Sequence, residues 1–314
     1  MNGCVVCAAE DFEAVFCASD RLYHTTAAEF SVVRCRACGL LRLHPRPDAA
    51  ELRRYYPGSY WFAPDQSAAG RLEEAYRRLV LRDHVRFVRR ALAESRARGP
   101  LVDAGCGGGL FLAMMRRHGF RALGLDVSPE AAALAWRRQR APAVCAVLEA
   151  PPFPAASLAG LTLFHVLEHI PDPCAYLRAA HELLAPDGRL IVQVPNAASW
   201  QCRLLGRRWN GADVPRHLWD FRASDMVKLM ERCGFEVLRR KYFSLRDNPA
   251  GLASSLAPGL DPMARRVRRV AEGRLARLVK DAVYLALVAA ALPFTILEAA
   301  CRAGSTVTIE ARRT

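Results

Sequence analysis

The chain has 314 residues, of which 52% are hydrophobic and 24% are charged. This composition supplies enough apolar material for a packed core, and it excludes both an isolated mini-domain and a disordered chain. Forty-five basic residues stand against 31 acidic ones, and the net charge of +14 suits an acidic partner such as nucleic acid or an anionic membrane surface. Because almost all of the basic residues are arginines, the excess by itself does not choose between these partners.

The amino-terminal stretch contains two Cys-x-x-Cys pairs, Cys4 with Cys7 and Cys35 with Cys38. Each such pair can direct two thiolates toward one centre, and four thiolates make the closed tetrahedral site that zinc prefers. The first residues lack the basic start and long apolar run of a secretory signal, so we expect a reducing, cytoplasmic setting. Residues 1–46 are therefore predicted to be a zinc-ribbon-like module with a structural zinc ion. Cys17 is an alternative ligand.

Residues 47–99 are predicted to connect this module to a larger domain. An aromatic stretch from Leu52 to Phe62 is expected to pack the two parts together, and covering a pocket is the alternative. From Arg71 to Arg96 the apolar residues recur at helical spacing, which predicts one amphipathic helix.

Beyond Gly99-Pro100 the pattern alternates between strand and helix. Ser128-Pro129 and Asp172-Pro173 have the residue types of helix starts. Repeated units of this kind predict an α/β fold with a doubly wound, Rossmann-like parallel sheet that binds its ligand at the carboxyl ends of the strands. Strands are expected at 101–104, 121–126, 143–147, 161–166, 189–194 and 235–243, and helices at 110–118 and 224–233.

A glycine-rich loop joins the first of these strands to the following helix. Its pattern is Asp103-x-Gly105-x-Gly107-x-Gly109, whereas a nicotinamide fingerprint would need glycine or alanine where Leu110 stands. Glycine is needed where the backbone turns sharply and approaches a ligand closely. An acid two residues before the first glycine disfavours a pyrophosphate and suits a ligand that carries an ammonium or sulfonium group.

Three motifs in register resemble the class I S-adenosylmethionine-dependent methyltransferases. These are the glycine loop, Gly124-Leu-Asp126 at the end of the second strand, and the segment 163–170, which reads LFHVLEHI. The resemblance covers roughly residues 71–236, and residues 304–312 resemble the last strand of the family. It implies that Asp103, Gly105, Gly107 and Gly109 cradle the methionyl part of the cofactor, that Asp126 holds the ribose hydroxyls and that His165 lies at the cofactor.

Methyl transfer from an activated sulfonium requires a positioned nucleophile and a base that removes its proton. His169, oriented by Glu168, is one candidate base, and His217 after the fifth strand is the other. Each candidate also has a purely structural alternative. Glu168 and His169 would then cap a loop, and His217 would lie in a packing loop. A third alternative is a mixed cation site formed by His165 with these three residues, similar to metal-dependent methyltransferases of the ubiquinone and small-RNA classes.

The cysteine module joined to this domain resembles a bacterial group of sugar, natural-product and polysaccharide-cluster methyltransferases. The sugar C-methyltransferases of that group carry a further carboxy-terminal α/β domain that this chain is too short to hold. We therefore predict transfer to an oxygen, rather than a carbon, of a small, glycosylated or lipid-linked acceptor. The alternative function is a zinc-ribbon nucleic-acid-binding protein with an idle methyltransferase-like domain, although no strongly basic run accompanies the cysteine pairs.

Seven basic residues lie between Arg265 and Lys280, and a charge-free run of sixteen residues follows from Ala282 to Leu297. Because roughly 20 apolar residues are needed to span a bilayer, we expect no transmembrane helix. The segment is expected to cover the sheet or form a homodimer interface, with peripheral contact at the inner face of the membrane through 263–300 as the alternative. The predicted division is a zinc module (1–46), connector and helix (47–99), methyltransferase domain (100–249), helical insertion (250–302) and final strand (303–314).

Overall fold

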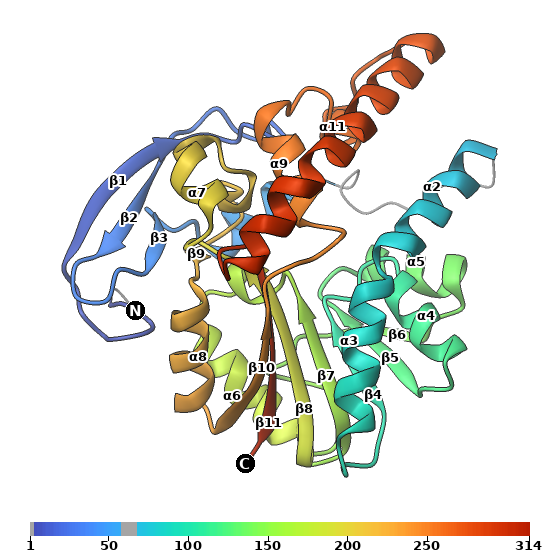
Figure 1. Ribbon diagram of the computed structural model, residues 1–314. Coiled ribbons are helices and arrows are strands. Elements are labelled where there is room, and N and C mark those ends of the chain that lie inside the picture. The colour runs from blue at the N-terminus through green and yellow to red at the C-terminus, as the bar shows by residue number, and fades with distance from the viewer. Residues whose placement is uncertain (1–2, 58–67) are drawn as a thin grey trace. The chain divides into compact units, whose positions relative to one another are not determined.

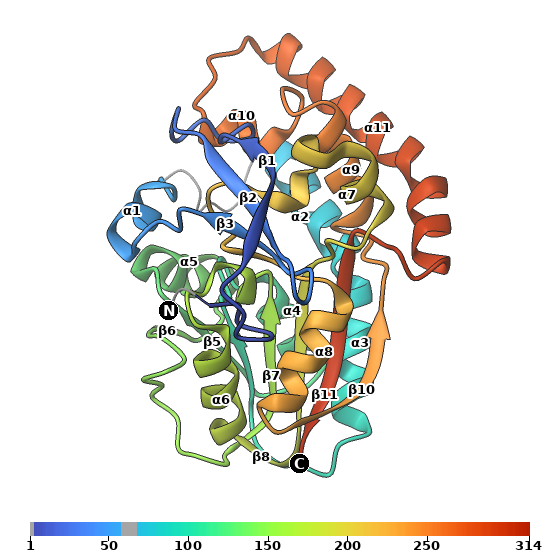
Figure 2. The ribbon, with the colours of Figure 1, turned by 90° about the vertical axis from the view of Figure 1, so that its left-hand side faces the viewer.

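The computed structural model describes residues 3–57 and 68–314. Those residues form one sheet of seven strands and one of four (Figures 1 and 2). The chain divides into two compact units, each assembled from three segments. The amino-terminal unit contains Met1–Tyr60, Pro195–Met226 and Asp247–Val307, and the α/β unit contains Trp61–Val194, Val227–Arg246 and Thr308–Thr314. The five-part division of the sequence remains a prediction.

The seven-stranded sheet forms the centre of the α/β unit, in the order β10-β11-β8-β7-β4-β5-β6. The pairs formed by β4, β5, β6, β7 and β8 are parallel, and β10 pairs with β11 in the antiparallel direction. The inner strands read as continuous apolar runs because helices cover both faces. The strands are β4 (Leu101–Ala104), β5 (Ala122–Asp126), β6 (Ala143–Cys145), β7 (Leu158–Phe164), β8 (Leu184–Pro195), β10 (Phe235–Lys241) and β11 (Thr306–Arg313).

Helices cover the two faces of this sheet, with α3 and α4 on one side and α6 and α8 on the other (Figures 1 and 2). Ser128 accepts a hydrogen bond from the amide of Ala131 and so caps α5, and Asp172 caps α6, as the sequence predicted. The helices are α2 (Ala68–Val80), α3 (Arg82–Ala93), α4 (Leu110–Arg117), α5 (Pro129–Gln139), α6 (Pro173–Leu183) and α8 (Ala223–Arg232), with a short 3₁₀ turn η2 (Leu167–His169). The predicted α/β, Rossmann-like fold is confirmed.

Three expectations about individual elements were wrong. The single helix predicted from Arg71 to Arg96 is two helices, α2 and α3, which meet at Leu81. Only α3 presents a buried stripe, formed by Val85, Val88 and Ala91, to the core of the α/β unit. The strand predicted over 143–147 ends at Cys145, because β6 is the outermost strand and pairs with β5 over three residues only. The fourth strand starts earlier than expected, at Leu158, because its first residues pair with β8.

The four-stranded sheet belongs to the amino-terminal unit, in the order β1-β2-β3-β9 with antiparallel neighbours. Its fourth strand is formed by Trp219 and Asp220, far along the chain, which pair with Arg42 and Leu41. The elements of this unit are β1 (Phe12–Ala18), β2 (Phe30–Cys35), β3 (Leu41–His44), α1 (Ala49–Arg54), α7 (Trp200–Leu205), η3 (Gly206–Arg208), η4 (Asn210–Ala212), β9 (Trp219–Asp220), α9 (Asn248–Leu256), α10 (Pro262–Val267) and α11 (Arg274–Ala300). The segment 250–302 is helical, as predicted.

A buried ion-pair cluster centred on Arg216 cross-links the amino-terminal unit. The fully buried guanidinium donates to the carboxylates of Asp20 and Asp213 at 2.9 and 2.7 Å. It also lies 4.4 Å from the centre of the Tyr23 ring. Burial alone would raise the pKa of Asp20, but the adjacent guanidinium outweighs burial and lowers that pKa to about 2. Removing one partner would leave an uncompensated buried charge, which costs several kcal/mol.

The aromatic connector is described only in part, since residues 58–67 lie outside the described residues. Within the described part, Tyr55 packs edge-on against Phe30 with ring centres 6.3 Å apart. Both residues belong to the amino-terminal unit. Because this contact lies within one unit, the expectation that the stretch packs the two parts together stays a prediction.

Candidate functional site

The glycine loop between β4 and α4 needs glycine for two physical reasons. Gly105, Gly107 and Gly109 have φ values of 77°, 50° and 73°, in the left-handed region that other residues rarely adopt. A Cβ atom on Gly105 would lie 2.5 Å from a methyl carbon of Val166, and one on Gly109 would lie 2.7 Å from the Cβ of Ala135. The predicted loop residues therefore lie together at the carboxyl end of β4, where a sheet of this type binds its ligand.

Asp126, at the carboxyl end of β5, is held by this loop. Its Oδ2 accepts a hydrogen bond from the amide of Gly107 and its Oδ1 accepts one from the amide of Ser128, both at 2.9 Å. Each carboxylate oxygen keeps a second acceptor position, so the oriented carboxylate can still receive two hydroxyl groups. Asp126 is itself buried, and the neighbouring Val127 is 65% exposed to solvent.

Asp103, at the end of the adjacent strand β4, is buried and accepts a hydrogen bond of 2.6 Å from the hydroxyl of Thr162. Burial raises the pKa of Asp103 to about 7. The Thr162 hydroxyl opposes this rise, and the negative charge of Asp126 adds to it. Burial also raises the pKa of Asp126, against the hydrogen bonds from Ser128 and Gly107. A positively charged ligand would favour the ionised form of both carboxylates.

A chain of hydrogen bonds crosses the sheet beside this loop and ends at Glu168. The hydroxyl of Thr308 donates to Oε1 of Gln193 at 2.8 Å, which leaves the Gln193 amide to donate to Nε2 of His165, also at 2.8 Å. The proton of the His165 ring is thereby placed on Nδ1, which lies 3.2 Å from Oε1 of the fully buried Glu168.

The backbone of His165 has a φ of 57°, a strained conformation for a residue other than glycine. Strained residues of this kind cluster at functional sites, where the surrounding contacts hold them in place. Here those contacts include the two ring nitrogens and the main-chain amide, which donates to the carbonyl of Gln193 at 2.9 Å. The structure thus orders the segment at the end of β7, and the assignment of His165 to the cofactor stays a prediction.

The two candidate bases lie in different units. His169 is half-buried at the end of η2 in the α/β unit, directly after Glu168. His217 belongs to the amino-terminal unit, where its Nδ1 donates to the carbonyl of Gly211 at 2.7 Å. That bond leaves the lone pair of the neutral His217 ring on Nε2, 4.0 Å from a carboxylate oxygen of Asp213. The carbonyl of Gly211 thus fixes the tautomer of the neutral His217 ring, and the role of His217 as a base stays a prediction.

The four predicted zinc ligands form a cluster in the amino-terminal unit. The sulfur atoms of Cys4, Cys7, Cys35 and Cys38 all lie within 4.8 Å of one another. The Cys4–Cys38 and Cys7–Cys35 sulfur pairs are 3.5 and 3.6 Å apart, close to the edge of about 3.8 Å in a tetrahedron with 2.3 Å zinc–sulfur bonds. Cys17 lies outside this cluster, next to the hydroxyl of Ser31.

Two arginines supply positive charge beside these sulfur atoms. Arg42 stacks on the ring of Phe12, 3.8 Å from its centre, and the guanidinium of Arg222 donates to the carbonyl of Cys38. The charges of Cys4 and Cys38 raise the pKa of Arg222, although its bonds to Asp225 contribute most. Because four thiolates and one Zn²⁺ carry a net charge of −2, nearby guanidinium groups favour the metal-bound form. The donor set therefore fits zinc.

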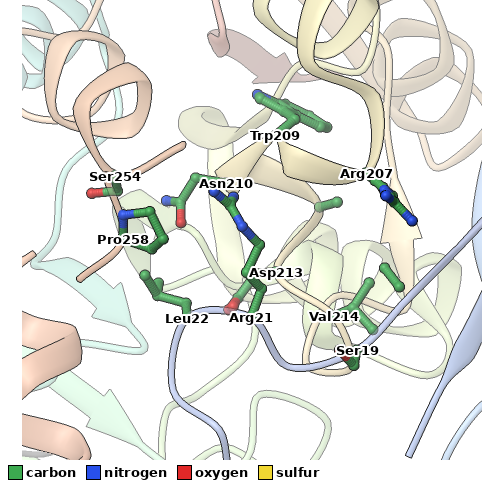
Figure 3. Close-up of a pocket in the computed structure, with 12 residues that line it drawn as sticks. Ser19, Arg21, Leu22, Arg207, Trp209, Asn210, Asp213, Val214, Ser254 and Pro258 are labelled. Atoms are coloured by element: carbon green, nitrogen blue, oxygen red, sulfur yellow. The ribbon is translucent and has the colours of Figure 1, made fainter. Parts of the chain in front are cut away.

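A hollow of about 360 Å³, open to solvent, lies in the amino-terminal unit beside Trp209 and Asn210 (Figure 3). Arg21 extends into it, and its guanidinium donates to the carbonyls of Arg208 and Ser255, both at 2.7 Å. These bonds tie three segments of the unit together. Arg21 therefore acts as a structural cross-link in this hollow and not as a ligand-binding cation.

Comparison with known proteins agrees with the fold and the glycine-loop site. The family described as Methyltransferase domain matches residues 73–240. A ubiquinone biosynthesis O-methyltransferase of Cronobacter sakazakii is 30% identical over 173 residues, which cover 51% of this chain and 70% of that protein. The corresponding protein of Cereibacter sphaeroides is 29% identical over 168 residues, 50% of this chain and 67% of that one. A solved methyltransferase from Archaeoglobus fulgidus is 15% identical with a TM-score of 0.48, covering 78% of this chain and all of that one.

The chain belongs to the methyltransferase domain family, and the protein is a class I S-adenosylmethionine-dependent methyltransferase. The matched residues include Asp103, the three glycines, Asp126 and the segment that holds His165, Glu168 and His169. The cysteine cluster and α11 lie outside the matched range, so the family match does not account for them. The two carboxylates beside the glycine loop fit a cofactor that carries a cationic group and hydroxyls, and the individual roles of Asp103 and Asp126 stay predictions.

The raised pKa of Asp103 predicts that cofactor binding depends on pH. Below about pH 7 the free protein holds a proton on this carboxyl group, and that proton must leave before the carboxylate can face the ligand's ammonium group. The affinity for S-adenosylhomocysteine is expected to fall about tenfold per pH unit below 7 and to level off above it. Calorimetry from pH 5.5 to 8.5 measures this, and Asp103→Asn should flatten the profile. Equal affinity at pH 5.5 and 8 would contradict the prediction.

Sequence reasoning missed three residues that shape this site: Thr162, Gln193 and Thr308. Each is a buried polar residue in an otherwise apolar strand, β7, β8 or β11. That departure from the apolar pattern was the available signal, because a buried polar side chain normally has a hydrogen-bond partner. The identity of the partners depends on which strands are neighbours, which the sequence pattern did not reveal.

Proposed function

We propose that this methyltransferase transfers the methyl group to an oxygen atom of a small, glycosylated or lipid-linked acceptor in the cytoplasm. The observation that carries the proposal is the tautomer of His217, whose Nε2 holds a lone pair suited to removing a hydroxyl proton. The relatives at 30% identity, named as O-methyltransferases, support oxygen as the acceptor atom. The seven cysteines outside the proposed zinc site form no disulfide bonds, which supports a reducing compartment.

When bound, S-adenosylmethionine supplies a methyl group on an activated sulfonium, and the chain's residues hold the reactants and accept a proton. The glycine loop with Asp103 and Asp126 binds the cofactor. His217 would accept the acceptor's hydroxyl proton on Nε2 as the acceptor oxygen receives the methyl group, so that a neutral ether and a neutral thioether would result. Asp213 stabilises the imidazolium that results, since its carboxylate lies on the side of Nε2. His169 is the second candidate base.

The cysteine cluster is proposed to hold one structural zinc ion. Four thiolates fill all positions of a tetrahedral ion and leave none for water or substrate, so the metal takes no part in methyl transfer. The position of the cluster between β2 and β3 supports this role, because Cys35 ends β2 and Cys38 lies in the turn that leads to β3. The alternative cation site at His165, Glu168, His169 and His217 remains a prediction.

A matched set of histidine variants tests the base. The change His217→Ala is expected to leave the affinity for S-adenosylhomocysteine within about twofold of wild type and to lower turnover roughly 100-fold or more, the usual contribution of a general base. His169→Ala tests the other candidate in the same way, and His118→Ala, on the exposed end of α4, is the control. Full activity in both the 217 and the 169 variants would remove both residues from the mechanism.

The acceptor needed for that assay is identified by incubating the protein with methyl-labelled cofactor and a panel of hydroxylated small molecules, glycosides and lipid-linked sugars. Labelled product with a methyl ether supports oxygen transfer, and a carbon–methyl product contradicts it. Calorimetry of the native protein with S-adenosylhomocysteine is the prior test. If the native protein does not bind S-adenosylhomocysteine, the proposed function is wrong. The alternative, a nucleic-acid-binding protein with a catalytically inactive methyltransferase-like domain, would then be favoured.

A further inference from the structure

Helix α11, which runs for 27 residues from Arg274 to Ala300, has one face fixed to the amino-terminal unit. Val288, Ala291, Thr295 and Glu298 recur at helical spacing and are its buried residues. The Glu298 carboxylate accepts bonds of 2.9 Å from both the main-chain amide and the side-chain amide of Gln201. One turn from this stripe, the Tyr284 hydroxyl lies 2.8 Å from that of Ser254 in α9, which runs alongside α11 (Figures 1 and 2). These polar contacts set the rotation of the helix.

The opposite face of α11 is apolar and exposed. Its large residues also recur at helical spacing, and they are Leu275, Leu278, Val279, Val283, Leu285, Ile296 and Leu297, each between 44% and 76% exposed. Small residues and Pro293 fill the positions between them, and no charged side chain occurs from Ala282 to Leu297. The outer face of a surface helix is normally polar, so a continuous apolar face of this kind marks an interaction surface. We call it the outer face of α11.

Positive charge surrounds this face at its amino-terminal end. Between Pro262 and Arg302 there are eight basic and three acidic residues. All three acids are engaged inside the unit, since Glu272 pairs with Arg265 and Lys280, Asp281 pairs with Arg265, and Glu298 is buried against Gln201. The exposed charge is therefore predominantly positive. The exposed cations are Arg269, Arg274, Arg277 and Arg302, of which Arg277 lies 3.9 Å from Asp281. Anionic headgroups would complement this pattern, whereas a second copy of the chain would bring further arginines to it.

The geometry favours a helix that lies on a bilayer over one that crosses it. By length and composition α11 is the one helix among the described residues that could span a membrane, with a mean hydropathy of 1.9 over its most apolar 18 residues, only 22% of which is buried. Its charge-free run of sixteen residues measures only about 24 Å at 1.5 Å per residue, short of the roughly 30 Å hydrocarbon core. Spanning would also carry Glu298 away from Gln201 into lipid.

We propose that α11 docks the protein peripherally on an anionic lipid bilayer, with its outer face buried at the boundary between headgroups and acyl chains. Arg274 directly precedes Leu275 at the first turn of this face, so its guanidinium group reaches the lipid phosphates while its aliphatic stem lies at the edge of the face. The proposal rests on α11 and its basic flank alone and does not depend on the choice of methyl acceptor.

Sedimentation with vesicles tests it. The native protein is expected to co-sediment with vesicles of phosphatidylcholine and phosphatidylglycerol in a 7:3 ratio, to bind pure phosphatidylcholine much more weakly and to lose binding as salt rises. Leu285→Glu combined with Ile296→Glu should abolish sedimentation. Arg274→Gln should weaken it roughly fivefold, and Arg277→Gln should have a smaller effect, because Arg277 lies on the side of the buried stripe and pairs with Asp281. The matched control is Leu72→Glu, because Leu72 is equally exposed, at 73%, but belongs to α2 of the α/β unit.

Calorimetry with S-adenosylhomocysteine checks that each variant is folded, and the pair Leu285→Ser with Ile296→Ser replaces the glutamate pair if folding is lost. Three outcomes would overturn the proposal. In the first, the native protein does not sediment with anionic vesicles. In the second, the outer-face variants sediment as well as the control. In the third, sedimentation velocity shows a native dimer that does not bind vesicles and that the outer-face substitutions dissociate. The last outcome would assign the face to a second copy of the chain.

Discussion

The substitution Asp126→Ala is expected to weaken the binding of S-adenosylhomocysteine by about ten- to a hundredfold. A carboxylate that accepts hydrogen bonds contributes roughly 1.5–3 kcal/mol. This one is proposed to accept bonds from the ligand hydroxyls, and it holds the glycine loop through the amide of Gly107. The loss is measured by calorimetry at pH 8, where the neighbouring Asp103 is ionised and does not limit binding.

Two further variants separate ligand contact from loop damage. Asp126→Asn keeps the shape and one acceptor oxygen, so its affinity should fall between those of the wild type and the alanine variant. Glu231→Ala removes an exposed acid of α8 in the same unit and should bind like the wild type. Unchanged affinity in Asp126→Ala would show that the carboxylate does not hold the cofactor, whatever the family resemblance implies.

Metal analysis of the native protein is expected to give about one equivalent of zinc per chain, and the variant Cys4→Ser with Cys7→Ser is expected to lose it. A hydroxyl group replaces neither thiolate as a ligand, and a structural zinc site contributes on the order of 10 kcal/mol to the folding of its module. Thermal unfolding should then begin at a temperature at least 10 °C lower, roughly the effect of losing a few kcal/mol in a chain of this length.

Cys17→Ser is the control for this experiment, because the Cys17 sulfur lies beside Ser31 and outside the cluster. Its zinc content should match that of the wild type. If the double variant keeps its zinc, the four-cysteine site is refuted. If the native protein contains no zinc when purified without chelator, the thiols of Cys4, Cys7, Cys35 and Cys38 are only packed together.

The pairing of cysteines in residues 1–46 and the alternation of strands and helices after Gly99 were both predictable, because they depend on local spacing. The loop from Asp103 to Gly109 was equally clear, since only glycine tolerates its positive φ angles. The break between α2 and α3 at Leu81 was not predictable, because both helices continue one helical period in sequence and only the packing of α3 against the core separates them.

The candidate site divides in the same way. Asp126 and His165 were identified from motifs, but the residues that orient them come from distant parts of the chain. Thr308 reaches Gln193 only because β11 lies beside β8, and Thr162 reaches Asp103 only because β7 lies beside β4. Strand order depends on contacts between residues far apart in sequence, and no local pattern specifies it.

The sequence by itself determined that this protein binds S-adenosylmethionine on an α/β sheet, because the glycine loop and the acids that follow two strands are local features. Only the tertiary structure decided that Trp219 and Asp220 complete the sheet of the cysteine module and that Arg216 joins that module to the later segments. Tertiary structure also decided which face of α11 is left apolar and exposed. Because α11 is apolar on most sides, its composition does not determine which side is buried. The hydrogen bonds of Glu298 and Tyr284 fix the rotation of the helix about its axis.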